Sequence, residues 1–120
     1  MRLGVVGALA GAVAVAAGAF GAHGLRDRLD AASLAAFETA VRYQLVHAIA
    51  LVFTAQRARQ HPSRAASLAG GLFVAGMLLF SGSLYALALG APRIVGVITP
   101  FGGLSFIAGW VALAASFRAG

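Results

Sequence analysis

The chain carries no charged side chain from Leu3 to Ala22, a run of 20 residues. An α-helix rises about 1.5 Å per residue, so such a run crosses the roughly 30 Å hydrocarbon core of a bilayer. Three further apolar stretches follow, and only 10% of all residues are charged. A soluble domain has about 25% charged residues. We therefore expect the chain to fold in lipid.

The apolar stretches predict an all-α, integral membrane four-helix bundle that runs up-down-up-down in one transmembrane domain, residues 1–120. Asp30 suits the N-cap of the second helix, and Pro62 suits the first turn of the third. Gly90 suits the C-terminal end of the third helix. The predicted helices span about 3–22, 31–57, 62–89 and 94 or 99 to 117.

Two readings of the fourth helix stay open. Thr99-Pro100 is typical of an N-cap followed by proline, which leaves 94–98 outside the helix. Alternatively, a helix from Ile94 is kinked at Pro100. We favour the start at Thr99. The first helix also resembles a signal peptide, although its length and its glycine pattern favour a retained packing helix.

Arginine supplies all nine basic residues, and the net charge is +6. Because these arginines sit at the edges of apolar runs, they indicate membrane anchoring and no nucleic-acid partner. Five lie at the termini and in the second loop, and four on the other side with all three acids. We therefore expect a multi-pass protein of a bacterial inner (plasma) membrane with both termini cytoplasmic.

Small residues form one face on two of the predicted helices. In lipid such faces allow close helix packing, because helices there associate by contact rather than by hydrophobic drive. We expect the two faces to pack against each other. The first face holds Gly4, Gly7, Gly11, Ala14, Gly18 and Gly21, and the second holds Gly102, Ser105, Gly109, Ala112 and Ser116.

A few polar residues fall inside the predicted spans, where unpaired polar groups are costly. They form a predicted polar layer of His23, Tyr43, Gln44, His47, Ser81, Ser83, Tyr85 and Thr99. One interpretation is structural, with hydrogen bonds between helices. The other is a proton or solute path. We expect a neutral His47 that bonds to Ser81, Ser83 or Tyr85.

Catalytic chemistry finds little support. The chain has no cysteine, and its carboxylates, Asp27, Asp30 and Glu38, lie near one membrane interface. His23 and His47 differ in depth by roughly 15 Å at 1.5 Å per residue, which disfavours a shared metal or haem. No catalytic residue, metal site or cofactor is therefore predicted.

Four motifs in order resemble those of the YgdD/YwdK-type uncharacterised inner-membrane proteins, a domain-of-unknown-function family with animal relatives. This resemblance implies a small polytopic membrane protein and supplies no activity. The matching motifs are Gly18-Ala19-Phe20-Gly21-Ala22-His23-Gly24-Leu25, Tyr43-Gln44 with His47-Ala48, Leu79-Phe80-Ser81-Gly82-Ser83-Leu84-Tyr85, and Thr99-Pro100-Phe101-Gly102-Gly103 with Gly109-Trp110.

The function that the sequence favours is a non-enzymatic scaffold, accessory subunit or lipid-facing module. The alternative is a small transporter or proton-coupled channel that uses His23, Tyr43, His47 and Ser81. The expected partners are the lipid bilayer and either a second copy of the chain or another membrane protein.

Overall fold

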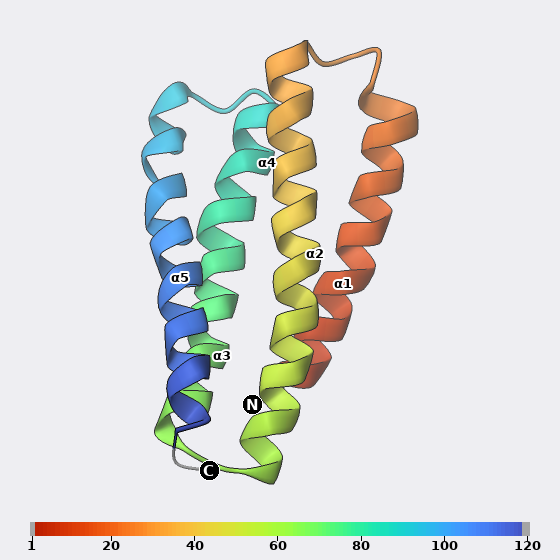
Figure 1. Ribbon diagram of the computed structural model, residues 1–120. Helices are drawn as coiled ribbons and strands as arrows, with labels where there is room; N and C mark the ends of the chain where they lie inside the picture. Colours follow the sequence, from red (N-terminus) through yellow and green to blue (C-terminus); the bar gives the residue numbers. More distant parts are fainter. Residues whose placement is uncertain (1, 119–120) are drawn as a thin grey trace.

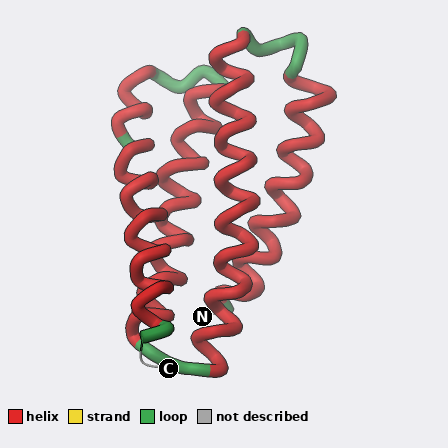
Figure 2. The backbone as a smooth tube through the Cα atoms, viewed as in Figure 1, coloured by secondary structure: helices red, strands yellow, loops and turns green. Residues whose placement is uncertain are grey.

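The computed structural model describes residues 2–118, and their regular structure is helical (Figures 1 and 2). The all-α class predicted from the sequence is confirmed. The elements are α1 (Leu3–Phe20), the π-helical turn η1 (Gly21–Leu25), α2 (Ala31–Gln60), α3 (Arg64–Gly76), the π-helical turn η2 (Met77–Ser81), α4 (Gly82–Ala88), the 3₁₀ turn η3 (Arg93–Val97) and α5 (Thr99–Ser116).

These elements form four helical rods, because α1 continues into η1, and α3, η2 and α4 follow one another without a break. Successive rods run in opposite directions, and both chain ends lie at the same end of the molecule (Figure 1). Three rods are long and apolar enough to cross a membrane, namely Leu3–Leu25, Arg64–Ala88 and Arg93–Ser116. The fourth, α2, contacts α1, α3 and α4.

Helix ends follow local hydrogen bonding. The Asp30 carboxylate accepts from the Ser33 amide at 2.8 Å, which confirms the predicted N-cap of α2. The same bond holds the pKa of Asp30 below its usual value. At α3 the cap is the Ser63 hydroxyl, which accepts from the Ala66 amide at 3.1 Å. Therefore α3 begins at Arg64, two residues later than predicted.

Gly90 ends the third rod. Its φ is 106°, a backbone conformation that glycine adopts without steric cost. The Gly90 amide donates to the Leu87 carbonyl, and the Ala91 amide donates to the Ala86 carbonyl. This pair of bonds is the Schellman arrangement, and it satisfies carbonyls that the helix end leaves free.

The start of α5 lies at Thr99, as we favoured, with Pro100 in the first turn. The preceding residues differ from that prediction, because Arg93–Val97 form a 3₁₀ turn. Thr99 is already helical and does not cap the helix; Ile98 is in the N-cap position. The Thr99 hydroxyl instead shares a hydrogen bond with Ser83.

Five glycines of α1 and η1 face α2. A Cβ added at Gly7 would lie 3.0 Å from both the Ala48 carbonyl oxygen and the Val52 amide nitrogen. The backbones therefore approach closely at this point. The remaining neighbours in this interface are Ala55 at Gly4, Ala48 at Gly11, Val41 at Gly18 and Phe37 at Gly21.

The small residues of α5 face the third rod. A Cβ at Gly102 would lie 2.3 Å from the Phe80 amide nitrogen, and one at Gly109 would meet the Phe73 ring at 2.8 Å. The expected pairing of the two small faces is therefore wrong: α1 lies along α2, and α5 lies along α3 (Figure 1). The α5 face accommodates phenylalanines of the third rod, whereas the α1 face meets mainly alanine and valine of α2.

The turn η2 interrupts the third rod near its middle, where the sequence predicted an uninterrupted helix. The Gly82 amide donates to the Met77 carbonyl five residues back, as in a π-helix. The Ser81 hydroxyl donates to the Ala40 carbonyl of α2 at 2.9 Å and fixes this turn against the neighbouring rod. Single π turns in α-helices frequently occur at functional sites.

Candidate functional site

Six of the eight residues of the predicted polar layer belong to three separate groups in the structure. One surrounds His47 between α2 and α5. A second joins Gln44 of α2 to Tyr85 of α4. The third consists of serine and threonine hydroxyls on the third rod and at the start of α5. The layer therefore does not form one continuous chain of polar groups.

His47 is buried and makes a hydrogen bond with each ring nitrogen. Its Nδ1 lies 2.7 Å from the Tyr43 carbonyl oxygen, which can only accept. Its Nε2 lies 3.0 Å from the indole nitrogen of Trp110, which can only donate. A ring that donates through Nδ1 and accepts through Nε2 is a neutral imidazole. The partners expected from the sequence, Ser81, Ser83 and Tyr85, do not bond to this ring.

Aromatic rings surround the His47 imidazole. The Phe106 ring stacks on it with 3.6 Å between centroids, and the Phe73 ring lies at 5.6 Å. Trp110 meets both His47 and Phe73 edge to face. The imidazole is therefore enclosed by apolar surface. Its hydrogen bond to Trp110 joins α2 to α5, whereas its bond to the Tyr43 carbonyl lies within α2.

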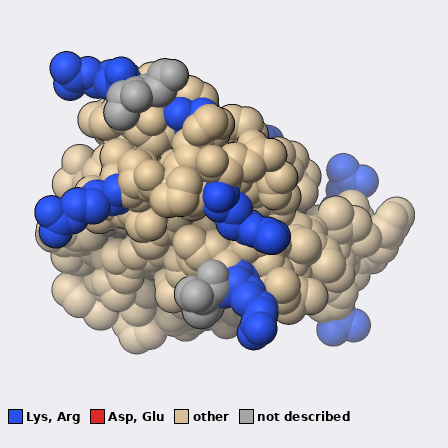
Figure 3. Space-filling model, turned by 90° about the horizontal axis from the view of Figure 1, so that it is seen from below, with Lys and Arg blue, Asp and Glu red and all other residues tan. Residues whose placement is uncertain are grey.

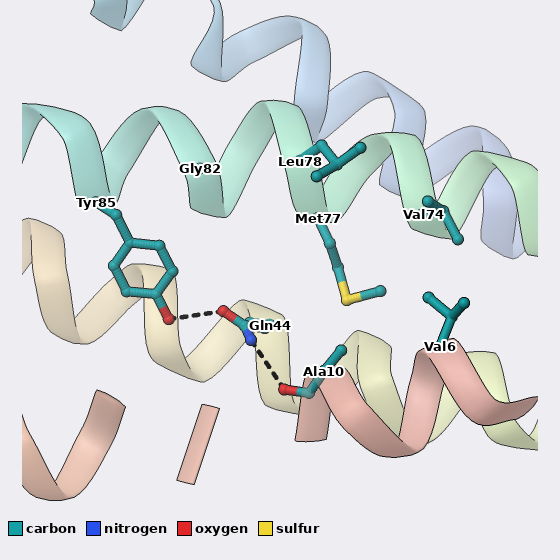
Figure 4. A pocket seen from close by; sticks show the side chains of 8 residues that line it. All are labelled: Val6, Ala10, Gln44, Val74, Met77, Leu78, Gly82 and Tyr85. Atoms are coloured by element: carbon teal, nitrogen blue, oxygen red, sulfur yellow. Dashed lines mark hydrogen bonds between the residues drawn. The ribbon is translucent and has the colours of Figure 1, made fainter. Parts of the chain in front are cut away.

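Gln44 connects three rods. Its amide nitrogen donates to the Ala10 carbonyl of α1 at 2.8 Å. Its amide oxygen accepts from the Tyr85 hydroxyl of α4 at 2.7 Å. Since both ends of the amide are bonded within the protein, Gln44 serves as a cross-link between α1 and α4 in a place where these helices are otherwise apart (Figure 4).

Two predicted residues lie apart from these groups. His23 is exposed within η1, close to one end of the molecule. Tyr43 contributes its carbonyl to the His47 bond, whereas its side chain is 41% exposed and packs on the Phe80 ring with 4.7 Å between centroids. Neither side chain enters the hydrogen bonds of His47 or Gln44.

A pocket of about 260 Å³ lies beside the Gln44 cross-link, between α1 and the third rod (Figure 4). Its wall includes the π turn η2 and the glycine that follows it. Of the predicted polar layer, only Gln44 and Tyr85 line it. The complete lining is Val6, Ala10, Gln44, Val74, Met77, Leu78, Gly82 and Tyr85.

This lining offers little for catalysis. It holds no charged side chain and no nucleophile in an activated arrangement. Within residues 2–118, no three His, Cys, Asp or Glu side chains gather closely enough to hold a metal ion. The chemistry available is thus the burial of an uncharged molecule against apolar walls.

Sequence reasoning missed Trp110, Met77 and Gly82. Trp110 is the only tryptophan of the chain, and an indole N–H away from water needs an acceptor, so an indole within an apolar span was a usable signal. Met77 and Gly82 owe their place in the pocket to the π turn. The turn contains no proline, and its one polar residue, Ser81, had been assigned to the predicted polar layer and not to a π turn.

Comparisons with known proteins find membrane proteins among the relatives of this chain. The family model of a protein of unknown function (DUF423) matches residues 17–103. The UPF0382 membrane protein of Staphylococcus haemolyticus is 45% identical over 109 residues, which is 91% of this chain and 88% of that protein. The UPF0382 membrane protein of Haemophilus influenzae is 45% identical over 107 residues, 89% of this chain and 86% of its own.

The UPF0382 inner membrane protein YgdD of Escherichia coli is 38% identical over 106 residues, covering 88% of this chain and 81% of its own. The YwdK protein of Bacillus subtilis is 41% identical over 108 residues, 89% of this chain and 88% of its own. No solved structure matches this chain. The resemblance seen in the four motifs is therefore confirmed, and the chain belongs to the DUF423 family, whose relatives carry the name UPF0382 membrane protein.

Proposed function

We propose that this protein is a non-enzymatic membrane protein that acts as a scaffold or accessory subunit. The observation that carries this proposal is the use of its interior polar groups. His47, Gln44 and Ser81 each bond to a group of another helix, so they hold helices together. A site for proton transfer or hydrolysis needs polar groups that remain free for a substrate.

The carboxylates support the same proposal. Asp27 and Asp30 lie in the segment between η1 and α2, and Glu38 is an exposed residue at the start of the third turn of α2. From Glu38 to His47 is nine residues, or roughly 13 Å along the helix. No acid therefore reaches the interior histidine to raise its basicity or to share its proton.

We further propose that the four rods cross the membrane, with both termini in the cytoplasm. The end that holds both termini carries five arginines and no acid, whereas the other end carries four arginines and three acids. Figure 3, a view onto the first end, shows blue side chains and no red ones. Arginine-rich loops stay on the cytoplasmic side. The relatives' printed names, among them inner membrane protein, support this location.

Reporter fusions test this topology. A phosphatase or fluorescent reporter fused before residue 1 and, separately, after residue 120 is expected to report cytoplasm in both cases. A control fusion in the segment between η1 and α2 should report the opposite side. Termini that localise to opposite faces would contradict four crossings, and termini that both report the outside would contradict only the orientation.

The alternative function is a small transporter or proton-coupled channel. One observation favours it, namely that the pocket touches Gln44 and Tyr85 of the predicted polar layer. However, a proton path needs a series of exchangeable groups, and the other six lining residues are apolar or glycine. His47 lies outside this lining. The scaffold therefore remains the function that the geometry supports best.

Proton flux separates the two functions. Purified protein in liposomes with an enclosed pH-sensitive dye is expected to show the same proton leak as protein-free liposomes, with or without an applied potential. A His47→Gln variant should behave identically, because the histidine has no transport role in the scaffold. A flux above the leak that His47→Gln abolishes, in a variant that remains folded, would contradict the scaffold and favour the transporter.

A further inference from the structure

The pocket lies at mid-height on the side of the molecule. Ala10 is near the middle of α1, and Met77 is where α3 passes into η2. α1 packs along α2, whereas only a few close approaches join it to the third rod. The pocket is thus a gap between α1 and the third rod, with Gln44 of α2 in its lining (Figure 4).

Packed residues lie beyond both ends of this gap. Toward the chain termini, the Leu3 side chain lies 2.5 Å from where a Cβ of Gly70 would be, so α1 contacts α3 there. Toward the opposite end, Leu25, Phe37 and Ala88 belong to one buried cluster. A molecule that reaches the pocket must consequently come from the side, at the depth of the bilayer centre.

The chemistry of the lining selects the occupant. Gln44 uses its amide nitrogen on Ala10 and its amide oxygen on Tyr85, and the Tyr85 hydroxyl donates its only hydrogen to Gln44. All other lining side chains are apolar or absent. An ion or a polar solute would lose its hydration and gain at most the second amide hydrogen of Gln44 and the free lone pairs of Gln44 and Tyr85 as partners, which is costly. The walls complement an uncharged hydrocarbon.

The size of the pocket points to part of a chain rather than to a whole molecule. Its volume is about 260 Å³. A cavity of about 150 Å³ accepts benzene, and sites for whole drug-sized ligands begin near 300 Å³. A short stretch of methylene groups with a terminal methyl therefore fits. At the bilayer centre, the abundant molecules with that shape are the ends of lipid acyl chains.

We propose that this pocket is a binding site for the distal end of a phospholipid acyl chain, which enters sideways between α1 and the third rod. The proposal rests on the membrane crossing proposed above. Val6 and Val74 lie at one end of the pocket, and the Gln44–Tyr85 pair lies at the other. The lipid headgroup stays in its own leaflet and contributes no specificity.

The π turn provides the space for this chain. A Cβ at Gly82 would have as its nearest neighbour only the Met77 carbonyl oxygen, at 4.0 Å. A side chain at position 82 therefore has room for its first carbon, and because Gly82 lines the pocket, we expect a longer side chain to extend into it. Gly71 offers a matched control, because it is an exposed glycine of the same rod with no atom within 4 Å of an added Cβ, and it does not line the pocket.

Native mass spectrometry of the purified protein, released from mild detergent, tests the proposal. Wild type and Gly71→Leu are expected to retain about one phospholipid per chain, whereas Gly82→Leu loses it, because the leucine occupies the space of the acyl chain. Circular dichroism and monodispersity show that both variants fold. Equal lipid retention by folded Gly82→Leu and Gly71→Leu would overturn the proposal.

A second measurement does not depend on a variant. The chain has two methionines, so a ¹³C-methyl label gives Met77 one of only two signals. In deuterated protein within nanodiscs, the Met77 methyl is expected to show cross-relaxation to acyl-chain protons, and this is lost when the lipid chains are deuterated. Cross-relaxation to water, or to a second copy of the protein only, would overturn the proposal. The reporter fusions described above test the membrane topology separately. If they contradict it, the error lies in the topology and not in the lipid site alone.

Discussion

Alanine at Gly102 is expected to lower the free energy of unfolding by about 3 kcal/mol, the upper part of the usual range for overpacking a tight contact. The added methyl group would lie 2.3 Å from the Phe80 amide nitrogen and 2.7 Å from its Cα. These are backbone atoms of η2, so no side-chain rotation relieves the contact. Either α5 must move away from the third rod or the π turn must rearrange.

The neighbouring glycine is the control for this prediction. A Cβ at Gly103 would lie 3.8 Å from the nearest atom of the Phe80 ring, which is ordinary contact. Gly103→Ala should therefore leave the fold intact and gain up to about 1 kcal/mol from helix propensity. Denaturant or thermal unfolding in one detergent, followed by circular dichroism, measures both. Equal stability of the two variants would show that α5 does not approach η2 so closely.

The helix class and most helix ends followed from the sequence because they depend on local features. Charge-free runs identify rods, and Asp30 and Gly90 act on backbone groups within a few residues of themselves. All the groups that form such a helix cap lie within a few residues of one another, so the local sequence is enough to predict it. The same holds for the start of α5 at Thr99, because Pro100 suits the first turn of a helix, where its missing N–H costs no hydrogen bond.

Local sequence did not predict which helix packs against which. A small-residue face shows that a helix is approached closely, but it does not say by which neighbour. The face around Gly7 accommodates α2, and the face around Gly102 accommodates the backbone of η2. The α1 face meets mainly alanine and valine of α2, and the α5 face meets phenylalanines of the third rod, whereas we had expected the two small faces to meet each other. Space at a glycine can be filled by a large residue opposite it.

The site shows the same division. Depth along a helix can be counted from the sequence, so His47, Gln44 and Tyr85 were expected within the membrane. The direction in which each side chain points depends on how each rod is rotated about its axis. In the structure, this rotation brings His47 within hydrogen-bond distance of Trp110, and Gln44 within hydrogen-bond distance of Tyr85. The pocket could not be predicted at all, because it depends on the π turn at Met77.

Leucine at His47 is expected to destabilise the protein by about 1–3 kcal/mol, because it leaves the Trp110 indole N–H without an acceptor in an apolar environment. The Tyr43 carbonyl loses only one of its partners, since it belongs to the α2 helix. His47→Gln should cost less than His47→Leu, because the amide oxygen can accept from the indole. Unfolding in a single detergent, measured as for Gly102, compares the two variants.

A double-mutant cycle separates this stranded donor from the loss of ring packing. Trp110→Phe removes the indole N–H and keeps an aromatic ring near Phe73. If the stranded N–H causes the destabilisation, His47→Leu should cost less in the Trp110→Phe background than in the wild type, by at least about 0.5 kcal/mol. Removing one group of a buried hydrogen bond costs most when its partner remains and is left without a bond. Strictly additive effects would instead assign the cost to the lost stacking between His47 and Phe106, and the hydrogen bond to Trp110 would then contribute little to joining α2 and α5.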